Sequence, residues 1–363
     1  YEETKDMKQT WQRLRFWVST HRIPVLIGSS ILLIAIALGV VALAFSRAAV
    51  PEPANIPIKK KVVPPKKTYD LPLTGLKTTD ESDLTKAVTA IMIENSPAAR
   101  PQSGIKDAEI IYEAVAEGGI TRFVTIYQKN KPELVGPVRS VRPYYVDWYK
   151  PYDASMAHVG GSQKALQEIR NGSYRDLDQF FNAGTFWRAS DRAAPHNVYP
   201  SFENLDALNT EKGYPSSNPL VFPRGDKTDA AATDATDISV TISSPLFNSH
   251  YTYDSTTKLY ARSQGGAEHL DREKGAITPA VVIVLKVDEH TVQEETARQS
   301  ITTTGEGPAT IFQHGKVIEG TWYRDTTSDQ LQFRDQAGQP ITLARGQTWI
   351  TAVNSARGSV TWK

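Results

Sequence analysis

The feature that most constrains this chain is an apolar run from Ile23 to Ser46 that contains no charged side chain. About 20 such residues are enough to cross the hydrocarbon core of a bilayer as a helix. A core helix of this length in a globular protein would show a polar face, whereas this run offers only Ser29 and Ser30 near one end. A cleaved signal peptide is the alternative, because residues 42–44 read Ala-Leu-Ala. Since the run exceeds the ~7–15 apolar residues of a signal peptide, we predict a transmembrane helix.

Basic residues flank this run on both sides, so the positive-inside rule decides its orientation by a small margin. Three of the five basic residues before the run lie within about ten residues of it, against one after it. Trp11 and Trp17 fit an aromatic belt on the N-terminal side. We therefore predict a single-pass protein of the cell membrane with the bulk of the chain outside the cytoplasm.

The next segment, residues 47–69, carries five prolines, six basic residues and one acidic residue. This composition predicts an extended, self-repelling tether. Its basicity suits anionic lipid or an anionic wall polymer, and a solvated spacer is the alternative. The sequence contains no cysteine, which excludes disulfides, thiol catalysis and a lipidated cysteine among these residues.

The rest of the chain, from Asp70 onward, has 30 basic and 36 acidic residues. A nucleic-acid-binding domain usually has the opposite balance, so we exclude nucleic acid as a partner. Before residue 214, strand-like "AVTAIMIEN" and "RFVTIYQ" mix with helix-like "SQKALQEIRNG" and "SFENLDALN". After residue 237 nearly every segment reads as a strand. We therefore predict the α+β class.

The predicted organisation has six parts: a cytoplasmic tail (1–22), a transmembrane helix (23–46), a Pro/Lys-rich tether (47–69), an α+β ligand-binding domain of mixed elements (70–213), a turn-rich linker (214–237) and a mostly antiparallel β-rich domain (238–363).

Several local motifs resemble one known family. They are "ENSPAARPQSGIKDAEIIYEAVAEGGITRF", "GPVRSVRPYYVDW", "HVGGS", "APHNVY", "GTWYRD" and "GQPITLARGQTWI". Together they are similar to the YerB-like lipoprotein family, described as domain of unknown function 3048, over residues 75–363. The resemblance implies an extracytoplasmic, envelope-associated protein and supplies no established reaction. Many relatives carry a lipidated cysteine, which this sequence lacks, so the transmembrane helix would take over the anchoring role.

Three residues are candidates for catalysis: Glu113, His158 and His196. Glu113 and Glu117 lie four apart on a predicted strand, hence about 13 Å apart, which is too far for the ~5 Å or ~6.5–9.5 Å pair of a glycosidase. Glu113 therefore remains a candidate as a single catalytic acid. The two histidines stand in polar motifs and suit general acid–base chemistry, with structural hydrogen bonding as the alternative. No close spacing of metal ligands is present, so we predict no metal site, and the sequence identifies no cofactor.

The segment "VGPVRSVRPYYVDWYK" gathers arginines and aromatic rings in a few residues. Guanidinium groups bind carboxylates and phosphates bidentately, and aromatic faces stack on sugars or cations. Internal ion pairs and core packing are the alternative. The predicted ligand-binding residues are Arg122, Arg139, Arg142, Ser162, Arg192 and Asn197.

These features predict a membrane-anchored envelope protein that binds an anionic envelope polymer such as peptidoglycan. Whether it also cleaves or remodels that polymer is left open by the sequence. The alternative is a non-enzymatic scaffold that docks other envelope proteins through its β-rich domain. An enzyme would cluster ionisable side chains in a concave pocket, whereas a scaffold would present a flat apolar patch.

Overall fold

The computed structural model of the chain describes residues 3–20, 22–47, 66–226, 233–292 and 298–363. Most of the predicted tether and part of the predicted linker lie outside these ranges. Two compact units are distinguished, Tyr1–Pro65 and Lys66–Lys363, and each is described by itself.

The first unit contains two helices, α1 (Glu3–Thr20) and α2 (Arg22–Arg47). α2 covers the run for which the sequence predicts a transmembrane helix. Its described apolar side chains are exposed, Leu33 by 67% of its surface. Within the described ranges, however, no helix reaches the combined length and apolarity that crossing a bilayer requires. The predicted transmembrane span is therefore not supported by the structure.

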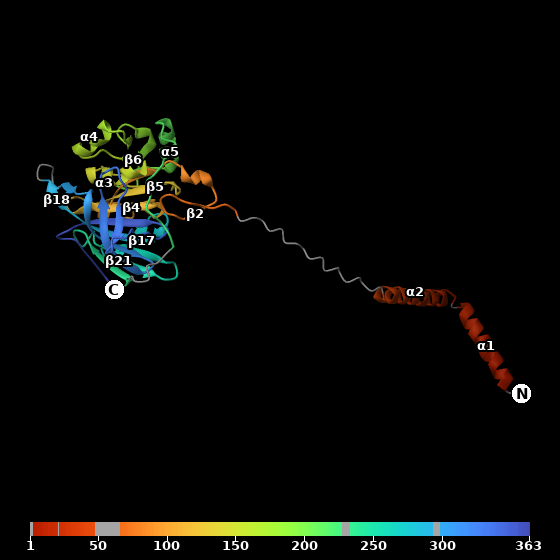
Figure 1. The fold of residues 1–363 in the computed structure, drawn as a ribbon. Coiled ribbons are helices and arrows are strands. Elements are labelled where there is room, and N and C mark those ends of the chain that lie inside the picture. The colour runs from red at the N-terminus through yellow and green to blue at the C-terminus, as the bar shows by residue number, and fades with distance from the viewer. Residues whose placement is uncertain (1–2, 21, 48–65, 227–232, 293–297) are drawn as a thin grey trace. The chain divides into compact units, whose positions relative to one another are not determined.

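A 13-stranded mixed sheet runs through the second unit (Figure 1). Its main path has the order β10 (Thr233–Asp234), β21 (Lys316–Arg324), β20 (Gly305–Gln313), β17 (Val281–Val287), β23 (Thr348–Asn354), β4 (Ile110–Glu117), β5 (Ile120–Tyr127), β3 (Thr89–Glu94), β6 (Ser155–His158) and β7 (Arg175–Asp178). Off this path, β18 (Glu289–Val292) pairs with β19 (Arg298–Ile301), β19 also pairs with β4, and β22 (Gln332–Asp335) pairs with β21.

Smaller sheets and helices surround this sheet. A five-stranded sheet has the order β14 (Ala267–Glu268), β13 (Leu259–Gln264), β12 (Ser249–Asp254), β11 (Asp237–Thr241) and β24 (Ser359–Trp362). The two-stranded sheets join β1 (Tyr69–Asp70) to β2 (Lys77–Thr78), β8 (Phe186–Arg188) to β9 (Val198–Pro200), and β15 (Leu270–Asp271) to β16 (Gly275–Ala276). The α-helices of this unit are α3 (Pro143–Tyr149), α4 (Gln163–Asn171) and α5 (Phe202–Glu211).

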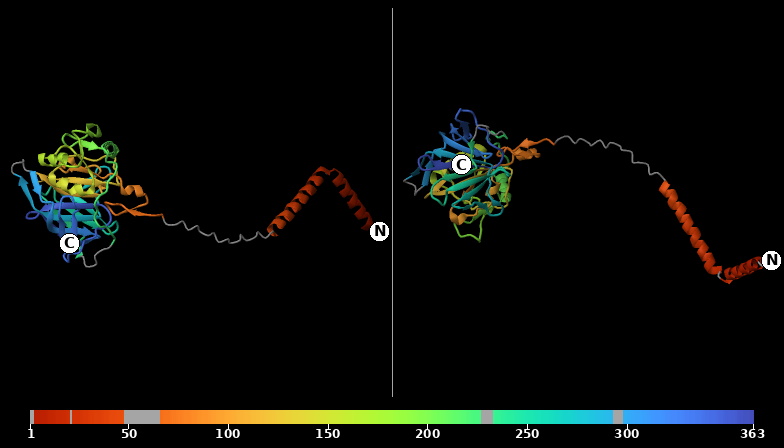
Figure 2. Two further views of the ribbon diagram at one scale, coloured as in Figure 1. Left: turned by 45° about the horizontal axis from the view of Figure 1, so that its top comes forward. Right: turned by 90° about the horizontal axis from the view of Figure 1, so that it is seen from below.

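The large sheet joins the two predicted domains. β23 from the C-terminal part lies parallel to β4 from the N-terminal part, with Thr351 beside Glu113, and its other neighbour is β17. Figure 2 shows strands from both parts side by side, the earlier ones in orange and yellow and the later ones in blue. The fold is thus a mixture of helices and many strands, as predicted in outline. The two predicted domains, residues 70–213 and 238–363, are successive segments of the sequence, and both contribute strands to one sheet.

Two helices lie in the segments for which the sequence predicts a helix. The Ser162 hydroxyl accepts a hydrogen bond from the backbone amide of Ala165 at the start of α4 (3.4 Å), and Gly172 follows the last turn. Ser201 caps α5 in the same way by accepting from the amide of Asn204 (3.1 Å). These side chains satisfy amides that a helix cannot pair internally.

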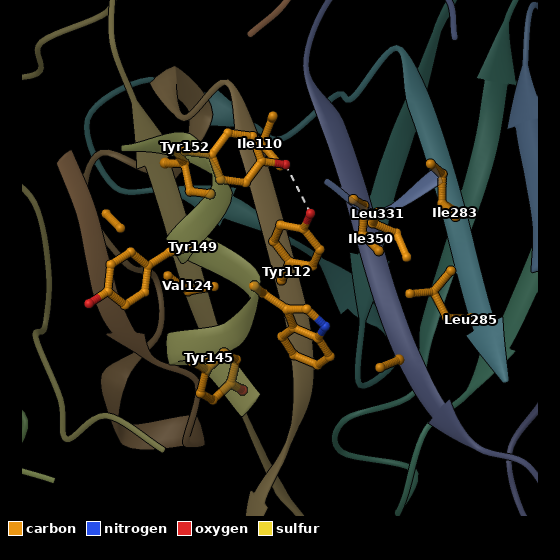
Figure 3. Packing of buried hydrophobic residues seen from close by; sticks show 14 of the residues in the cluster. Ile110, Tyr112, Val124, Tyr145, Tyr149, Tyr152, Ile283, Leu285, Leu331 and Ile350 are labelled. Atoms are coloured by element: carbon orange, nitrogen blue, oxygen red, sulfur yellow. Dashed lines mark hydrogen bonds between the residues drawn. The ribbon is translucent and has the colours of Figure 1, made fainter. Parts of the chain in front are cut away.

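The aromatic residues of the segment 135–150 belong to the hydrophobic core. Trp148 of α3 stacks on Tyr112 of β4, with ring centroids 5.3 Å apart and an angle of 11° between the rings. The Tyr112 and Tyr152 hydroxyls lie 2.9 Å apart, as Figure 3 shows. Tyr144 and Tyr145 are buried in the same cluster. Of the two interpretations of this segment, core packing therefore accounts for most of its rings.

We predict that the C-terminal part, residues 238–363, does not fold cooperatively by itself. Without β4, it would expose an edge and the apolar faces of β23, which is buried along its whole length. Thermal unfolding followed by circular dichroism should show a cooperative transition for residues 66–363 and none for the fragment. Co-expression of residues 66–237 should restore the transition. A cooperative transition of the isolated fragment would contradict this prediction.

Candidate functional site

The carboxyl ends of three parallel strands of the large sheet, β3, β6 and β7, lie side by side and form what we call the edge. β3 pairs in parallel with β6, and β6 pairs with β7, where His158 lies beside Asp178. A loop enters this edge between β3 and β6: the amide of Arg139 donates to the Met92 carbonyl (2.9 Å), and the Arg139 carbonyl accepts from the Val159 amide (3.1 Å). Ligand sites often lie beyond the carboxyl ends of parallel strands. Two predicted site residues, Arg139 and His158, thus share such an edge.

A carboxylate that the sequence analysis missed, Glu94, organises one end of this edge. Arg139 approaches both of its oxygens, with Nε 2.9 Å from Oε2 and Nη2 3.1 Å from Oε1. Oε1 also lies 2.9 Å from His196 Nδ1 and accepts from the Ser96 hydroxyl (2.8 Å). The Glu94 side chain is 6% exposed, while those of Arg139 and His196 are about one quarter exposed. The sequence feature that could have revealed Glu94 is its position as the carboxylate at the end of β3, a mostly apolar strand.

This arrangement orients His196 for contact with a ligand. Glu94 accepts a hydrogen bond from Nδ1–H and so selects the ring tautomer. No partner of Nε2 is present among the described residues, so this nitrogen is available to exchange a proton or to bind a polar ligand. A carboxylate behind a partly exposed histidine is an arrangement used in acid–base catalysis. The structure therefore brings Arg139 and His196 together on Glu94, a residue that the sequence analysis did not name.

His158 has a different environment. It is fully buried, with Nδ1 2.8 Å from the Gly160 carbonyl and Nε2 2.9 Å from Asp176 Oδ1. Both partners are acceptors, so both bonds form together only when the ring carries two protons. Burial acts to raise the pKa of Asp176, but the hydrogen bond from His158 and its charge outweigh this, and the pKa is lowered. Both ring nitrogens of His158 are thus engaged in holding the turn after β6, and a catalytic role finds no support.

Two more predicted arginines share the carboxylate of Glu117. Arg122 Nη2 lies 2.9 Å from Oε1, and Arg142 Nη2 lies 2.6 Å from Oε2. Burial acts to raise the pKa of Glu117, but the two guanidinium groups lower it below its usual value. Arg122 also donates to the Ser140 carbonyl (2.8 Å). Both terminal nitrogens of Arg122 are therefore engaged in contacts within the fold.

Arg142 also borders a cavity of about 210 Å³ at the amino ends of α3 and α4. Ser162, the second predicted ligand-binding residue at this place, lines the same cavity together with Lys164 and Arg298. The Arg142 side chain is 4% exposed, and its Nε has no hydrogen-bond partner among the described groups. Asp147 is the acidic residue of the lining, and burial raises its pKa. The lining thus contains Arg142, which is paired with Glu117, together with the cations Lys164 and Arg298 and the carboxyl group of Asp147.

Glu113 is not a catalytic acid in this structure, because its carboxylate lies wholly inside the fold. The side chain has no exposed surface, and neither has that of its ion-pair partner Arg262, whose Nη2 is 2.8 Å from Oε2. Its other hydrogen-bond donors are Trp349 Nε1 (3.0 Å), Thr121 Oγ1 (3.0 Å), Gln264 Nε2 (3.1 Å) and Asn95 Nδ2 (3.5 Å). A substrate has no access to a carboxylate that is saturated in this way.

The last two predicted residues shape the loop that carries His196. Arg192 donates to the carbonyls of Ala98 (3.4 Å) and Pro101. Asn197 accepts from Arg188 Nη1 (2.9 Å) and donates to the Ala189 carbonyl (3.0 Å). These contacts position the loop and give no direct ligand role to either side chain. Within the described part of the chain, no group of three or more histidine, aspartate or glutamate side chains is arranged to hold a metal ion.

We predict that Glu113→Gln lowers the free energy of unfolding by about 3–5 kcal/mol, because it leaves the Arg262 charge buried without a counter-ion. Glu319→Gln is the matched control, since Glu319 is an exposed residue of β21 whose charge remains in water. Urea denaturation of residues 66–363 measures both. Replacing Glu113 and Arg262 together by methionine should cost less than the single change. Equal stability of the two glutamine variants would refute a structural role for Glu113.

Comparison with known proteins assigns the second unit to a family. Residues 73–215 match the protein of unknown function (DUF3048) N-terminal domain, and residues 238–350 match the corresponding C-terminal domain. The chain is 34% identical over 291 residues to "Putative lipoprotein YerB" of Bacillus subtilis (strain 168), covering 79% of this chain and 87% of the relative. The crystal structure of YerB protein from Bacillus subtilis superposes with a TM-score of 0.72 at 31% identity, covering 81% of this chain and 99% of that one. This chain belongs to the DUF3048 family.

Proposed function

We propose that this chain is a membrane-attached, extracytoplasmic protein of the cell envelope that binds an anionic polymer of the peptidoglycan type. The relative's name, a lipoprotein, supports membrane attachment. The single observation that carries polymer binding is the cavity of about 210 Å³ that contains Arg142, Lys164 and Arg298.

The argument for binding rests on how Arg142 is buried. A buried guanidinium group is costly unless it is paired and hydrogen-bonded. Arg142 has Glu117 and a backbone carbonyl as partners, yet its Nε remains without one beside the cavity. An anionic group in the cavity would satisfy this donor and lie beside the cationic side chain of Lys164. Wall polymers that carry carboxylate or phosphate groups supply such anions.

The surface of α2 supports the proposal that this helix attaches the chain to the membrane. The described side chains from residue 30 to residue 43 are exposed and almost all are apolar. Water does not solvate such a helix favourably, so it needs an apolar environment. No residue of this sequence is a cysteine that could carry a lipid, and α2 is the segment that we propose for the attachment.

We predict that the full chain stays in the membrane pellet after extraction with alkaline carbonate and that a variant lacking residues 1–47 becomes soluble. Protease added outside cells with a permeabilised wall should digest residues beyond 70 and spare the N-terminal tail. Release of the full chain by carbonate would contradict insertion of α2. Protection of residues beyond 70 would contradict the orientation.

We predict that Lys164→Glu weakens sedimentation of the chain with purified cell walls roughly tenfold, because it reverses one charge beside a bound anion. Lys212→Glu is the matched control, an exposed lysine that directly follows α5 and does not line the cavity. Binding should also fall as salt concentration rises. Equal wall binding by both variants would reject the proposed cavity.

The same preparation tests the enzymatic alternative that Glu94 and His196 favour. Release of soluble fragments by the wild-type chain, lost in His196→Ala while wall binding persists, would establish cleavage. If the wild-type chain binds walls and releases nothing, the protein is a binding module.

A further inference from the structure

A second and larger cavity lies at the carboxyl ends of α3 and α4, with a volume of about 550 Å³. Tyr149, the last residue of α3, and Asn171, the last residue of α4, both line it, together with Lys150 and Tyr174. The cationic cavity of the proposed function is at the amino ends of the same two helices. Along α4, from Lys164 to Asn171, the separation is roughly 10 Å.

The Tyr149 hydroxyl is the first observation that points to a ligand. Its side chain is 1% exposed, and the oxygen has no hydrogen-bond partner among the described groups. The neighbouring tyrosines of the same cluster are satisfied: Tyr144 donates to the Val115 carbonyl (2.8 Å) and Tyr145 to the Ala114 carbonyl (3.0 Å). Buried polar groups in native proteins are nearly always hydrogen-bonded, and among the tyrosines of this cluster Tyr149 is the exception.

The direction of this hydroxyl agrees with a role in the cavity. Figure 3 shows the Tyr149 oxygen directed away from Tyr112 and Tyr152, at the border of the cluster. Burial and the nearby Tyr174 raise the pKa of Tyr149 well above its usual value. The hydroxyl therefore keeps its proton and can donate a hydrogen bond into the cavity that it lines.

The charged side chains that line the cavity differ in whether they have a partner within the fold. Asp153 is paired with Arg175 (2.8 Å), and Glu168 accepts a hydrogen bond from the Tyr174 hydroxyl (2.7 Å). Lys150 forms no ion pair with any described carboxylate, and its Nζ lies 5.5 Å from the centroid of the Tyr174 ring. The lining thus offers one cation without a counter-ion next to a buried hydroxyl donor. Such a set of groups suits a ligand that combines an acid with hydroxyl groups.

We propose that this cavity binds an acidic sugar, whose carboxylate meets Lys150 and whose ring oxygen or hydroxyl accepts from Tyr149, while the Asn171 amide contacts a further hydroxyl. The inference rests on the proposed function, because it assigns a sugar subsite to the same polymer that the cationic cavity holds. A chain of sugar units that lies along α3 and α4 would occupy both cavities.

Three probes separate recognition of the carboxylate from recognition of the sugar hydroxyl groups. They are glucuronic acid, which has both, glucose, which has only hydroxyl groups, and acetate, which has only the carboxylate. Saturation-transfer NMR with the full chain should show glucuronic acid binding at least several-fold more tightly than glucose or acetate. Lys150→Met should remove the preference for glucuronic acid over glucose. Tyr149→Phe should weaken binding of glucuronic acid about fivefold, the equivalent of one hydrogen bond.

The stability of the variants distinguishes a ligand role of Tyr149 from a structural one. Because its hydroxyl has no partner in the fold, Tyr149→Phe should leave the urea midpoint unchanged or raise it. Tyr145→Phe is the matched control: it removes a hydroxyl that is satisfied by the fold, so it should lower the midpoint and leave sugar binding intact.

Two results would overturn the proposal. The first is unchanged binding of glucuronic acid by Tyr149→Phe and Lys150→Met, and the second is a loss of stability in Tyr149→Phe as large as that in Tyr145→Phe. Failure of the proposed function looks different. If walls bind in a manner that needs Lys164 but neither Tyr149 nor Lys150, polymer binding stands and the sugar subsite falls. If glucuronic acid binds but walls do not, the polymer proposal falls alone.

Discussion

The ion pair between Glu113 and Arg262 is the interaction on which the rest of the fold depends. Both side chains are fully buried, and they come from the N-terminal and the C-terminal family segments respectively. Each charge alone would cost several kcal/mol to bury, so the two segments are held to a single arrangement in which the charges meet. Trp349 of β23 donates to the same carboxylate (3.0 Å), which fits the position of β23 directly beside β4. The family segments therefore behave as halves of one sheet.

This pair also connects the interior with the edge where Glu94 lies. Arg262 contacts His269, whose Nε2 lies 3.1 Å from the Gln102 side-chain carbonyl. Burial and the neighbouring Arg262 lower the pKa of His269 well below its usual value, so the ring is neutral and can accept from the guanidinium group. Gln102 in turn donates to the backbone carbonyl of Glu94 (2.9 Å). The position of Glu94, and with it the orientation of His196, is thus fixed by a chain of hydrogen bonds that starts at the buried ion pair.

Local sequence patterns predicted the helices and strands of this fold well, but they did not predict which distant residues contact one another. Helix α4 and strand β3 depend on patterns of neighbouring residues, and the sequence analysis predicts both. The sequence could not show that Arg262 would bury Glu113, because the two residues are 149 positions apart and only the sheet topology brings them together. The same limit explains why the predicted site residues do not all lie together. The His158 ring is held by Asp176 inside the fold, whereas Arg142 and Ser162 line one cavity. Glu94 was overlooked because its partners come from two distant loops.

Helix α3 explains how one short segment can serve both the core and a binding surface. Its rings face inward, where Trp148 stacks on Tyr112 and the Tyr145 hydroxyl is held by backbone carbonyls. Those contacts lock the helix, so the groups at its two ends, Arg142 and Tyr149, are held rigidly at their respective cavities. A ligand that binds there loses little energy in ordering the protein, since preorganised groups are already in place. In the proposed complex, the aromatic rings would therefore contribute to binding through rigidity, by fixing the polar atoms that α3 presents at its ends.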